Sequence, residues 1–303
     1  MAALLGPTAS GKSDTALLVA ERAGAEIVSV DSMQVYRGMD IGTAKPDAND
    51  LTRVPHHMID LADPADPYSV AQFQQAGREV LADLAERGVP ALIVGGSGLH
   101  FRSLIDPLEF PPSNPDLRRE VEALGMKGAV AALLEADPSA PDHVDIANPR
   151  RVMRALEVCR LTGATPSERA ALPEAVAVRG YEPLVEFVAG LFDPGEALPE
   201  RVEMRFDRML ERGLVDEVAA LAHRLGSTAS QAVGYKQLLP VTTGRWALNE
   251  GRRRAIDATR ALAGRQRTFF RRDPRPVPLE WHDDVTQRAG RLLALFEEAG
   301  WTS

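Results

Sequence analysis

The chain has 303 residues, of which 45% are hydrophobic and 26% charged, and its formal net charge is −8 at pH 7, so it is long enough to bury one large core or two smaller ones. A single cysteine, Cys159, excludes a disulfide framework and a cysteine-rich zinc site, and it fits a reducing compartment. No apolar run approaches the length of a membrane span, and we expect a cytoplasmic protein without a signal peptide or membrane contact.

A phosphate-binding pattern stands near the start of the chain. Residues 6–13 match G-x-x-x-x-G-K-[ST], between an apolar run at 2–5 that predicts a strand and a segment at 14–22, ended by Gly24, that predicts a helix. In such a loop the backbone N–H groups face phosphate oxygens, the lysine adds positive charge, and the last hydroxyl binds Mg²⁺. The residues predicted to bind phosphate are Gly6, Pro7, Thr8, Ala9, Ser10, Gly11, Lys12 and Ser13, with Ser13 as the Mg²⁺ ligand.

Asp31 follows the next predicted strand, at 26–30, and opens a long polar loop that runs to residue 46. Ligands of open parallel sheets bind at the carboxyl ends of the strands, so this carboxylate is a candidate for chemistry. From its position alone, Asp31 is equally well a general base or a ligand of Mg²⁺.

The following segments continue the alternation of strands and helices. A short strand is expected within 55–60, a helix over 70–87 that ends at Gly88, and a buried strand at 90–94 that brings Gly95-Gly96-Ser97-Gly98 to the edge holding the phosphate loop. This order predicts an α/β fold, a parallel sheet with helices on both faces.

The pattern changes after residue 110, where prolines are followed by helices expected at 117–124, 127–136 and 149–161. We therefore predict a helical insertion domain at 112–175 within a core formed by 1–111 and 176–303. One more strand is expected within 184–192. Further helices are expected at 200–212, 215–225, 235–239 and 250–271.

Arginines form two groups, although the chain as a whole is acidic. On a helix over 250–271, one side would carry Arg253, Arg260, Arg267 and Arg271, and a second group, Arg150, Arg151 and Arg154, begins the helix at 149. A basic groove of this kind suits a phosphodiester backbone, whereas the alternative is an ordinary solvated helix face.

Taken together, several blocks make the sequence similar to the bacterial tRNA dimethylallyltransferase family. They are residues 6–13, 29–32, 35–46, 95–98, 148–157, 201–206, 233–237 and 265–266, so the resemblance spans nearly the whole chain. It implies a P-loop, nucleotide-kinase-like core with a helical insertion. It also implies transfer of a dimethylallyl group from dimethylallyl diphosphate to N6 of adenosine 37, beside the tRNA anticodon.

The resemblance assigns chemical roles to single residues. Asp31 would act as the general base that takes the N6 proton, in preference to the metal-ligand alternative. Lys12, Arg205 and a Mg²⁺ ion near Ser13 would stabilise the departing diphosphate, while Ser97 would donate a hydrogen bond to the leaving oxygen.

The target adenosine must leave its stack in the anticodon loop before N6 can react. Contacts to tRNA are implied for Asp31, Ser32, Met33, Gln34, Ser97, Arg118, Arg150, Arg151, Val152, Met153, Arg154, Gln231, Ala232, Val233, Gly234, Tyr235 and Lys236. Gln34 would contact the Watson–Crick edge of the base. Arg118 and Arg154 could instead be ordinary surface residues, and Tyr235 a core aromatic.

The sequence departs from the usual family pattern at a few positions. Ser97 replaces a threonine, His100 stands where a tyrosine is usual, Arg150 replaces a glutamine, and Gln231-Ala232 stands where an arginine or a similar residue is usual.

Three alternative functions remain at this stage. A P-loop kinase would place ATP in the loop and use Asp31 to activate a hydroxyl of a small metabolite. An RNA-binding module without catalysis, or a prenyltransferase acting on free adenine nucleotides, would use parts of the same surface. For the tRNA dimethylallyltransferase that the resemblance implies, we expect a monomer.

Overall fold

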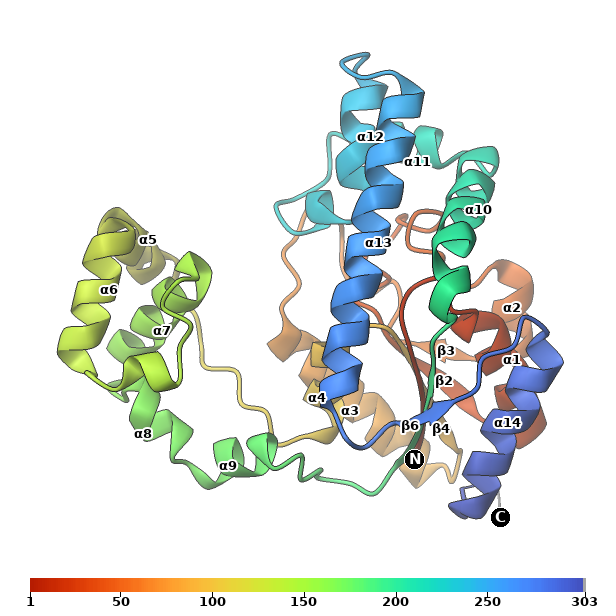
Figure 1. Ribbon diagram of the computed structural model, residues 1–303, viewed down its shortest axis with the longest axis horizontal. Helices are drawn as coiled ribbons and strands as arrows, with labels where there is room; N and C mark the ends of the chain where they lie inside the picture. Colours follow the sequence, from red (N-terminus) through yellow and green to blue (C-terminus); the bar gives the residue numbers. More distant parts are fainter. Residues whose placement is uncertain (302–303) are drawn as a thin grey trace. The chain divides into compact units, whose positions relative to one another are not determined.

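The computed structural model describes residues 1–301, and the core of the chain is one parallel sheet (Figure 1). The six strands lie in the order β3-β2-β4-β1-β5-β6. Their bounds are β1 Ala2–Leu5, β2 Glu26–Val30, β3 His56–His57, β4 Ala91–Gly95, β5 Val188–Phe192 and β6 Val277–Leu279.

Two compact units make up the chain: residues 1–105 with 185–303, and residues 106–184. The helices of the first unit are α1 Lys12–Ala23, α2 Ala48–Arg53, α3 Val70–Glu86, α4 Gly98–Ile105, α10 Leu198–Glu211, α11 Leu214–Leu221, α12 Tyr235–Thr242, α13 Leu248–Arg272 and α14 Val285–Glu298. The second unit contains α5 Pro115–Ala123, α6 Gly125–Ala136, α7 Pro149–Thr162, α8 Pro166–Ala170 and α9 Pro173–Arg179.

Alternation along the strands separates two apolar layers, because successive side chains of a strand point to opposite faces. In β1, Ala2 and Leu4 pack with α1 and α14 on one face, whereas Ala3 and Leu5 pack with the helices of the other face. The predicted α/β fold, with a parallel sheet and helices on both faces, is therefore confirmed.

The unit at 106–184 has an apolar core of its own, formed where α5, α6 and α7 meet around Val121, Leu133 and Val152. Its bounds are wider than the predicted insertion at 112–175. The predicted limit at 175 falls inside α9, which was not recognised in the sequence, and the other additional residues, 106–111 and 180–184, contain no helix.

Several elements were missed in the sequence. They are α2, α4, α8, α9, the edge strand β6 and the last helix, α14. Helix α14 did carry a signal, because Asp284 caps its N-terminus by accepting from the Thr286 N–H, and Ala289, Leu292 and Phe296 follow at helical spacing. Strand β6 has only three residues, too few for a period.

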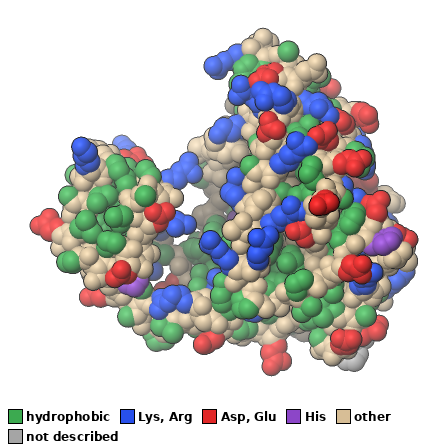
Figure 2. All heavy atoms as spheres, viewed as in Figure 1, with side chains coloured by type: hydrophobic (Ala, Val, Ile, Leu, Met, Phe, Trp, Pro, Cys, Tyr) green, Lys and Arg blue, Asp and Glu red, His purple; other side chains and the backbone are tan. Residues whose placement is uncertain are grey.

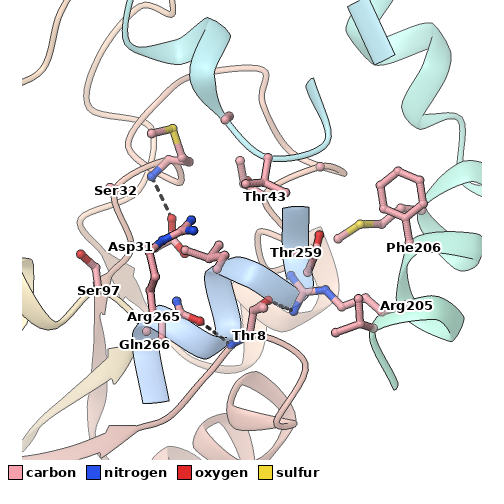
Figure 3. Close-up of a pocket in the computed structure, with 18 of the residues that line it drawn as sticks. Thr8, Asp31, Ser32, Thr43, Ser97, Arg205, Phe206, Thr259, Arg265 and Gln266 are labelled. Carbon is pink, nitrogen blue, oxygen red and sulfur yellow. Dashed lines mark hydrogen bonds between the residues drawn. The ribbon is translucent and has the colours of Figure 1, made fainter. Parts of the chain in front are cut away.

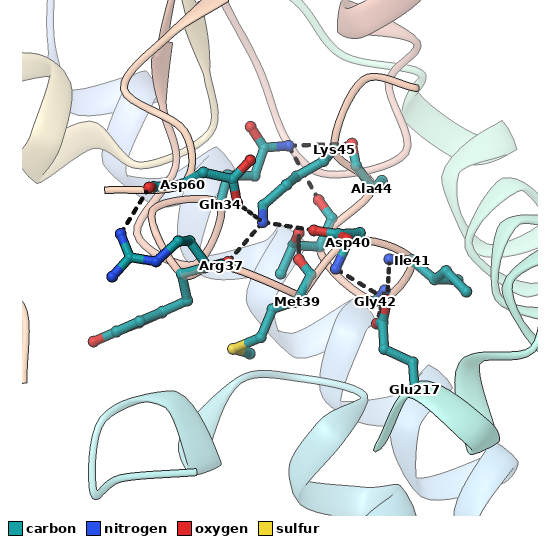
Figure 4. A network of polar contacts seen from close by, with 12 residues as sticks. Gln34, Arg37, Met39, Asp40, Ile41, Gly42, Ala44, Lys45, Asp60 and Glu217 are labelled. Atoms are coloured by element: carbon teal, nitrogen blue, oxygen red, sulfur yellow. Dashed lines mark hydrogen bonds and ion pairs between the residues drawn. The ribbon is translucent and has the colours of Figure 1, made fainter. Parts of the chain in front are cut away.

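One carboxylate fixes the long loop that follows β2. Glu217 on α11 accepts hydrogen bonds from the backbone N–H groups of Asp40 (3.0 Å), Ile41 (2.8 Å) and Gly42 (3.1 Å) (Figure 4). It also accepts one from the Tyr235 hydroxyl. A Cβ on Gly42 would lie 2.4 Å from the Tyr235 ring, so only glycine lets the loop approach this closely.

A lysine holds the same loop from its other side. The Lys45 ammonium is 2.7 Å from Asp40 and 2.5 Å from Asp60, and it donates to the Tyr36 carbonyl at 2.6 Å (Figure 4). Glu217 and Lys45 together fix the backbone of the segment 36–45. This segment contains Gly42 and Thr43, which line a cavity described below.

Replacing Glu217 by alanine should lower the free energy of unfolding by about 3 kcal/mol, because three backbone N–H groups and a hydroxyl lose a charged acceptor. Chemical denaturation followed by circular dichroism measures this. Glu211→Ala, an exposed position on the neighbouring helix, is the control and should change stability by less than about 0.5 kcal/mol. Equal midpoints for the two variants would contradict the bracing role of Glu217.

Candidate active site

Three neighbouring strands deliver the predicted site residues to one edge of the sheet. The phosphate loop follows β1, Asp31 follows β2, and Gly96-Ser97 follows β4, and these strands are adjacent in the order β2-β4-β1. Because all are parallel, their carboxyl ends meet, as the sequence predicted.

The phosphate loop is braced by contacts from distant parts of the chain. Gln266 on α13 accepts from the Thr8 N–H at 2.8 Å, Arg201 on α10 donates to the Ala9 carbonyl at 2.9 Å, and the Trp281 indole donates to the Ser10 carbonyl at 2.9 Å. The Thr8 amide therefore binds Gln266, which corrects the expectation that successive N–H groups of the loop all face phosphate.

Two recessed cations lie at this loop. Lys12 donates to the Pro7 carbonyl at 2.6 Å, and Arg205 donates to the Thr8 hydroxyl at 3.1 Å. Within residues 1–301 neither forms an ion pair with a carboxylate. Burial, helped by the positive charge of Arg205, lowers the pKa of Lys12 to about 7, and burial likewise lowers the pKa of Arg205. Such desolvated positive charges favour a bound anion.

Asp31 presents one oxygen to the site and uses the other for its own loop. Its Oδ1 accepts from the Met33 N–H at 2.8 Å and the Gln34 N–H at 3.3 Å, an Asx-type turn. No other hydrogen bond or ion pair of this carboxylate is found within residues 1–301. The second oxygen is therefore available to accept a proton.

Asp31 and Ser97 line the same cavity of about 290 Å³, together with Arg205 (Figure 3). In Figure 3, Asp31 and Ser97 lie on one side of this cavity, and Arg205 and Phe206 lie on the other. We call it the smaller cavity, because a larger one adjoins it. Eight of the other lining residues have apolar side chains: Met33, Val202, Phe206, Met209, Ala232, Val233, Leu262 and Phe269. Polar or charged side chains come from Thr8, Ser32, Thr43, Thr259, Arg265 and Gln266. The cavity therefore suits a flat or branched group that has both an apolar surface and polar atoms to bind.

A larger cavity, of about 380 Å³, adjoins it and contains the phosphate loop from Thr8 to Ser13. The two cavities share a wall made of Thr8, Asp31, Thr43, Gly96, Arg205, Met209 and Gln266. An anion on the phosphate loop and an apolar group in the smaller cavity can thus belong to neighbouring molecules, with Asp31 and Arg205 at the boundary.

The residues at the loop also fit a magnesium ion. Ser13 lies in the larger cavity, exposed, and no hydrogen bond occupies its hydroxyl within residues 1–301. The described residues contain no cluster of three or more His, Cys, Asp and Glu side chains that could hold a metal. Mg²⁺ commonly uses phosphate oxygens, water and only one or two protein ligands, so a hydroxyl beside bound phosphates is an adequate site.

Gln34 does not fit the role that the resemblance gave it. Its amide oxygen accepts from the Ser29 hydroxyl at 2.8 Å, and its amide nitrogen donates to the carbonyls of Thr43 and Ala44, each at 3.1 Å. The amide is therefore engaged inside the loop and is not free to contact a base edge, and we correct its role to that of a loop brace. Ser32 and Met33 do line the smaller cavity.

The expected tRNA residues of the helical unit differ in exposure. Arg118, Arg150 and Arg151 are exposed, whereas Val152 is 0% exposed and belongs to the core of that unit, so it is no surface contact. Arg154 donates to the carbonyls of Pro111 and Pro112 and pairs at 2.9 Å with Glu157. Arg118 lies 3.4 Å from the same carboxylate. Met153 is half-buried against this core.

The residues of the segment 231–236 also differ in whether they could contact tRNA. Tyr235 is 0% exposed, and its hydroxyl binds Glu217, so the core alternative is correct and a tRNA contact through this side chain is wrong. Ala232 and Val233 line the smaller cavity. Lys236 is exposed and donates to Gln231 at 2.8 Å, and Gly234 has a φ of +95° that suits glycine.

The predicted arginine stripe on α13 is largely neutralised by carboxylates. Arg253 pairs with Glu250 and Asp257, Arg260 with Glu203, and Arg267 with Asp193. Figure 2 shows acidic side chains among the basic ones over the face that carries this helix. These pairs favour the alternative of a solvated helix face for most of the stripe.

Arg205 was predicted, but the arginine row to which it belongs was missed. Arg201, Arg205 and Arg208 follow one another at helical spacing on α10, Arg212 caps the C-terminal end of this helix, and all four line the larger cavity. The spacing was visible in the sequence, but the glutamates and the aspartate between them concealed which side faces the phosphate loop.

Comparisons with known proteins agree with this geometry. The sequence matches the family described as IPP transferase over residues 34–273, and Isopentenyl transferase over residues 1–62. It is 43% identical to a tRNA dimethylallyltransferase of Bifidobacterium longum, covering 90% of this chain and 84% of that protein. It is 41% identical to one of Streptomyces griseus, covering 98% and 95%.

Solved structures are similar as well. A tRNA isopentenylpyrophosphate transferase of Bacillus halodurans has 33% identity and a TM-score of 0.70, with 99% of this chain and 97% of that chain covered. A eukaryotic dimethylallyltransferase acting on tRNA has a TM-score of 0.81 at 23% identity, which shows a shared fold. Within residues 1–301, no helix is long and apolar enough to cross a membrane.

The lowered pKa of Lys12 predicts a pH dependence of anion binding. Below pH 7 the free lysine is charged and attracts an anion, whereas above pH 7 it must first take up a proton, so affinity should fall as pH rises, by up to about tenfold per unit. Titration with inorganic diphosphate at fixed Mg²⁺, from pH 6.5 to 8.5, measures the dissociation constant. Lys12→Arg is the control, because arginine stays charged over this range and the ligand's own ionisation cancels between the two proteins. Parallel curves for the two proteins would refute the prediction.

Proposed function

The chain belongs to the IPP transferase family, and we propose that its two adjoining cavities bind a prenyl diphosphate and a tRNA adenine, with Asp31 as the general base between them. The protein is a transferase that modifies tRNA by adding a dimethylallyl group. The donor is dimethylallyl diphosphate, and the acceptor is N6 of adenosine 37.

The observation that carries this proposal is the shared wall of the two cavities, where Asp31, Arg205 and Gly96 face both. The transfer joins two molecules at a single carbon, so the donor's C1 and the acceptor's N6 must meet at one point. Anion-binding groups on one side and an apolar wall on the other allow the diphosphate and the base to approach that point from different cavities.

Negative charge develops on the diphosphate as the bond between C1 and oxygen breaks. Lys12 and Arg205 are recessed cations without a carboxylate partner in residues 1–301, so they are available to stabilise that charge. Ser97, across the cavity from Arg205, donates a hydrogen bond to the departing oxygen. A Mg²⁺ ion held by Ser13 and the phosphates would supply further positive charge when bound.

The bond between N6 and C1 forms as N6 loses a proton. Adenine N6 is a weak nucleophile because its lone pair is delocalised into the ring, so removal of its proton assists attack. The oxygen of Asp31 that is not engaged with the Met33 and Gln34 amides accepts this proton. The electron pair of the broken C1–O bond leaves with diphosphate, so the reaction needs no ATP.

The tRNA reaches the site with adenosine 37 turned out of its stack, which costs least in a single-stranded loop. Ser32, Met33, Ala232 and Val233 contact the base in the smaller cavity. The exposed Arg118, Arg150 and Arg151 of the helical unit contact the tRNA backbone. Both cavities are lined by one chain, so a monomer suffices, and the reaction belongs to the cytoplasm, where tRNA is found.

The test of this function is transfer of label from dimethylallyl diphosphate to unmodified tRNA with Mg²⁺ and without ATP. Labelled tRNA, with the label located at N6 of adenosine 37, supports the proposal. ATP turnover with a small alcohol, without labelled tRNA, would favour a metabolite kinase instead.

Asp31→Asn should lower the single-turnover transfer rate by at least a hundredfold, since general-base help contributes about 10² to 10⁴. Asparagine keeps the acceptor for the Met33 and Gln34 amides, so tRNA affinity should change by less than about threefold. The matched control is Asp47→Asn, whose carboxylate also lines the larger cavity and accepts from two backbone amides. A normal rate in Asp31→Asn would remove Asp31 as the base.

A further inference from the structure

Ser97 is hydrogen-bonded to a buried histidine that has no role in the proposed reaction. Its Oγ lies 2.7 Å from Nδ1 of His100, one turn further along α4, and His100 is only 9% exposed. Ser97 lines the smaller cavity, whereas His100 does not. The imidazole therefore touches the hydroxyl from behind, from the protein side of the cavity wall.

The surroundings of His100 keep its ring fixed and neutral. The Phe73 ring on α3 meets it edge to face, with centroids 4.5 Å apart at 82°. Burial lowers the pKa of His100 to about 4, although the negative charge of Asp31 partly opposes this. Gln74 and Arg78, also on α3, donate to the carbonyl of Ser103, which lies on α4 as His100 does. At neutral pH the imidazole thus carries one proton, on either Nδ1 or Nε2.

The direction of the hydrogen bond decides what Ser97 can do. A serine hydroxyl has one proton to donate and two lone pairs to accept with. If Nδ1 carried the lone pair, the hydroxyl proton would point at His100 and away from the cavity. If Nδ1 carries the proton, it donates to Oγ, and the hydroxyl proton stays free for a group in the cavity.

Serine also has more need of such a contact than threonine would. Without a β-methyl group, its χ1 angle is less restricted, and an unanchored hydroxyl samples several rotamers. The 2.7 Å contact with a fixed ring selects the rotamer in which Oγ lies at the cavity wall.

We propose that His100 is a positioning residue, which donates its Nδ1–H to Ser97 and so directs the Ser97 hydroxyl proton toward the departing diphosphate oxygen. His100 does not touch either substrate and takes no proton during the reaction. This inference rests on the proposed function, because it requires that Ser97 faces the leaving group.

The experiment measures single-turnover transfer to tRNA and the KM for dimethylallyl diphosphate in full-length variants, with thermal melts for each. His100→Leu removes the donor and should slow transfer about tenfold to a hundredfold, approaching the loss of an oxyanion donor, while KM changes less than about threefold. His100→Asn places an amide near the position of Nδ1 and should recover most of the rate.

A double-mutant cycle shows whether His100 acts through Ser97. In a Ser97→Ala background, adding His100→Leu should slow transfer by less than about twofold, because there is no hydroxyl left to orient. Ser103→Ala is the control on the same helix: it is buried, donates to the His100 carbonyl, and should leave the rate unchanged.

Four outcomes overturn the inference: a wild-type rate in His100→Leu, independent effects of His100→Leu and Ser97→Ala, failure of His100→Asn to recover the rate, or a wild-type rate in Ser97→Ala. The last would remove Ser97 from the reaction while the transferase activity stood, whereas absence of transfer by the wild-type protein would overturn the function itself.

If His100→Leu lowers the melting temperature markedly, His100→Asn is compared with His100→Gln, whose amide lies one atom further out. Equal rates of these two would also contradict the role of His100.

Discussion

Two recessed positively charged side chains, neither of which forms an ion pair with a carboxylate within residues 1–301, determine which ligand this site favours. Lys12 and Arg205 lie beside the phosphate loop, and within residues 1–301 their hydrogen bonds run to neutral oxygens of Pro7, Ser10 and Thr8. Removing charge from water without an opposite charge costs free energy, and a bound anion offsets that cost. The site is therefore built to gain most from a ligand that carries several negative charges close together.

The rest of the core holds this arrangement in place. Gln266 fixes the phosphate loop from α13, Arg201 from α10, and Trp281 from the segment before α14. Arg288 of α14 is 2% exposed and donates to the Thr15 hydroxyl in the first turns of α1. Elements late in the chain thus position the phosphate loop near its start. The positions of the two charges therefore depend on the complete fold.

Part of this could be predicted from sequence because the information was local. The phosphate loop, the strand before Asp31 and the glycine turn around Ser97 each follow from short patterns, and parallel strands bring their carboxyl ends together.

Gln34 could not be placed, since its partners Ser29, Thr43 and Ala44 depend on the path of the whole loop. Tyr235 was similarly ambiguous, because its burial depends on Glu217 and Gly42. Helix α14 is different: its cap and spacing were present in the sequence and were overlooked.

The bond between Glu217 and the loop is made to main-chain atoms, and this has an evolutionary consequence. A carboxylate that binds backbone amides does not depend on the identity of the side chains above them, so the side chain of Ile41 can diverge without loss of the contact. The carboxylate cannot diverge in the same way, and neither can Gly42, which admits the Tyr235 ring. A chimaera that exchanged this loop between distant homologues would remain intact only if the recipient kept the acid on α11, so loop and helix are inherited as one unit.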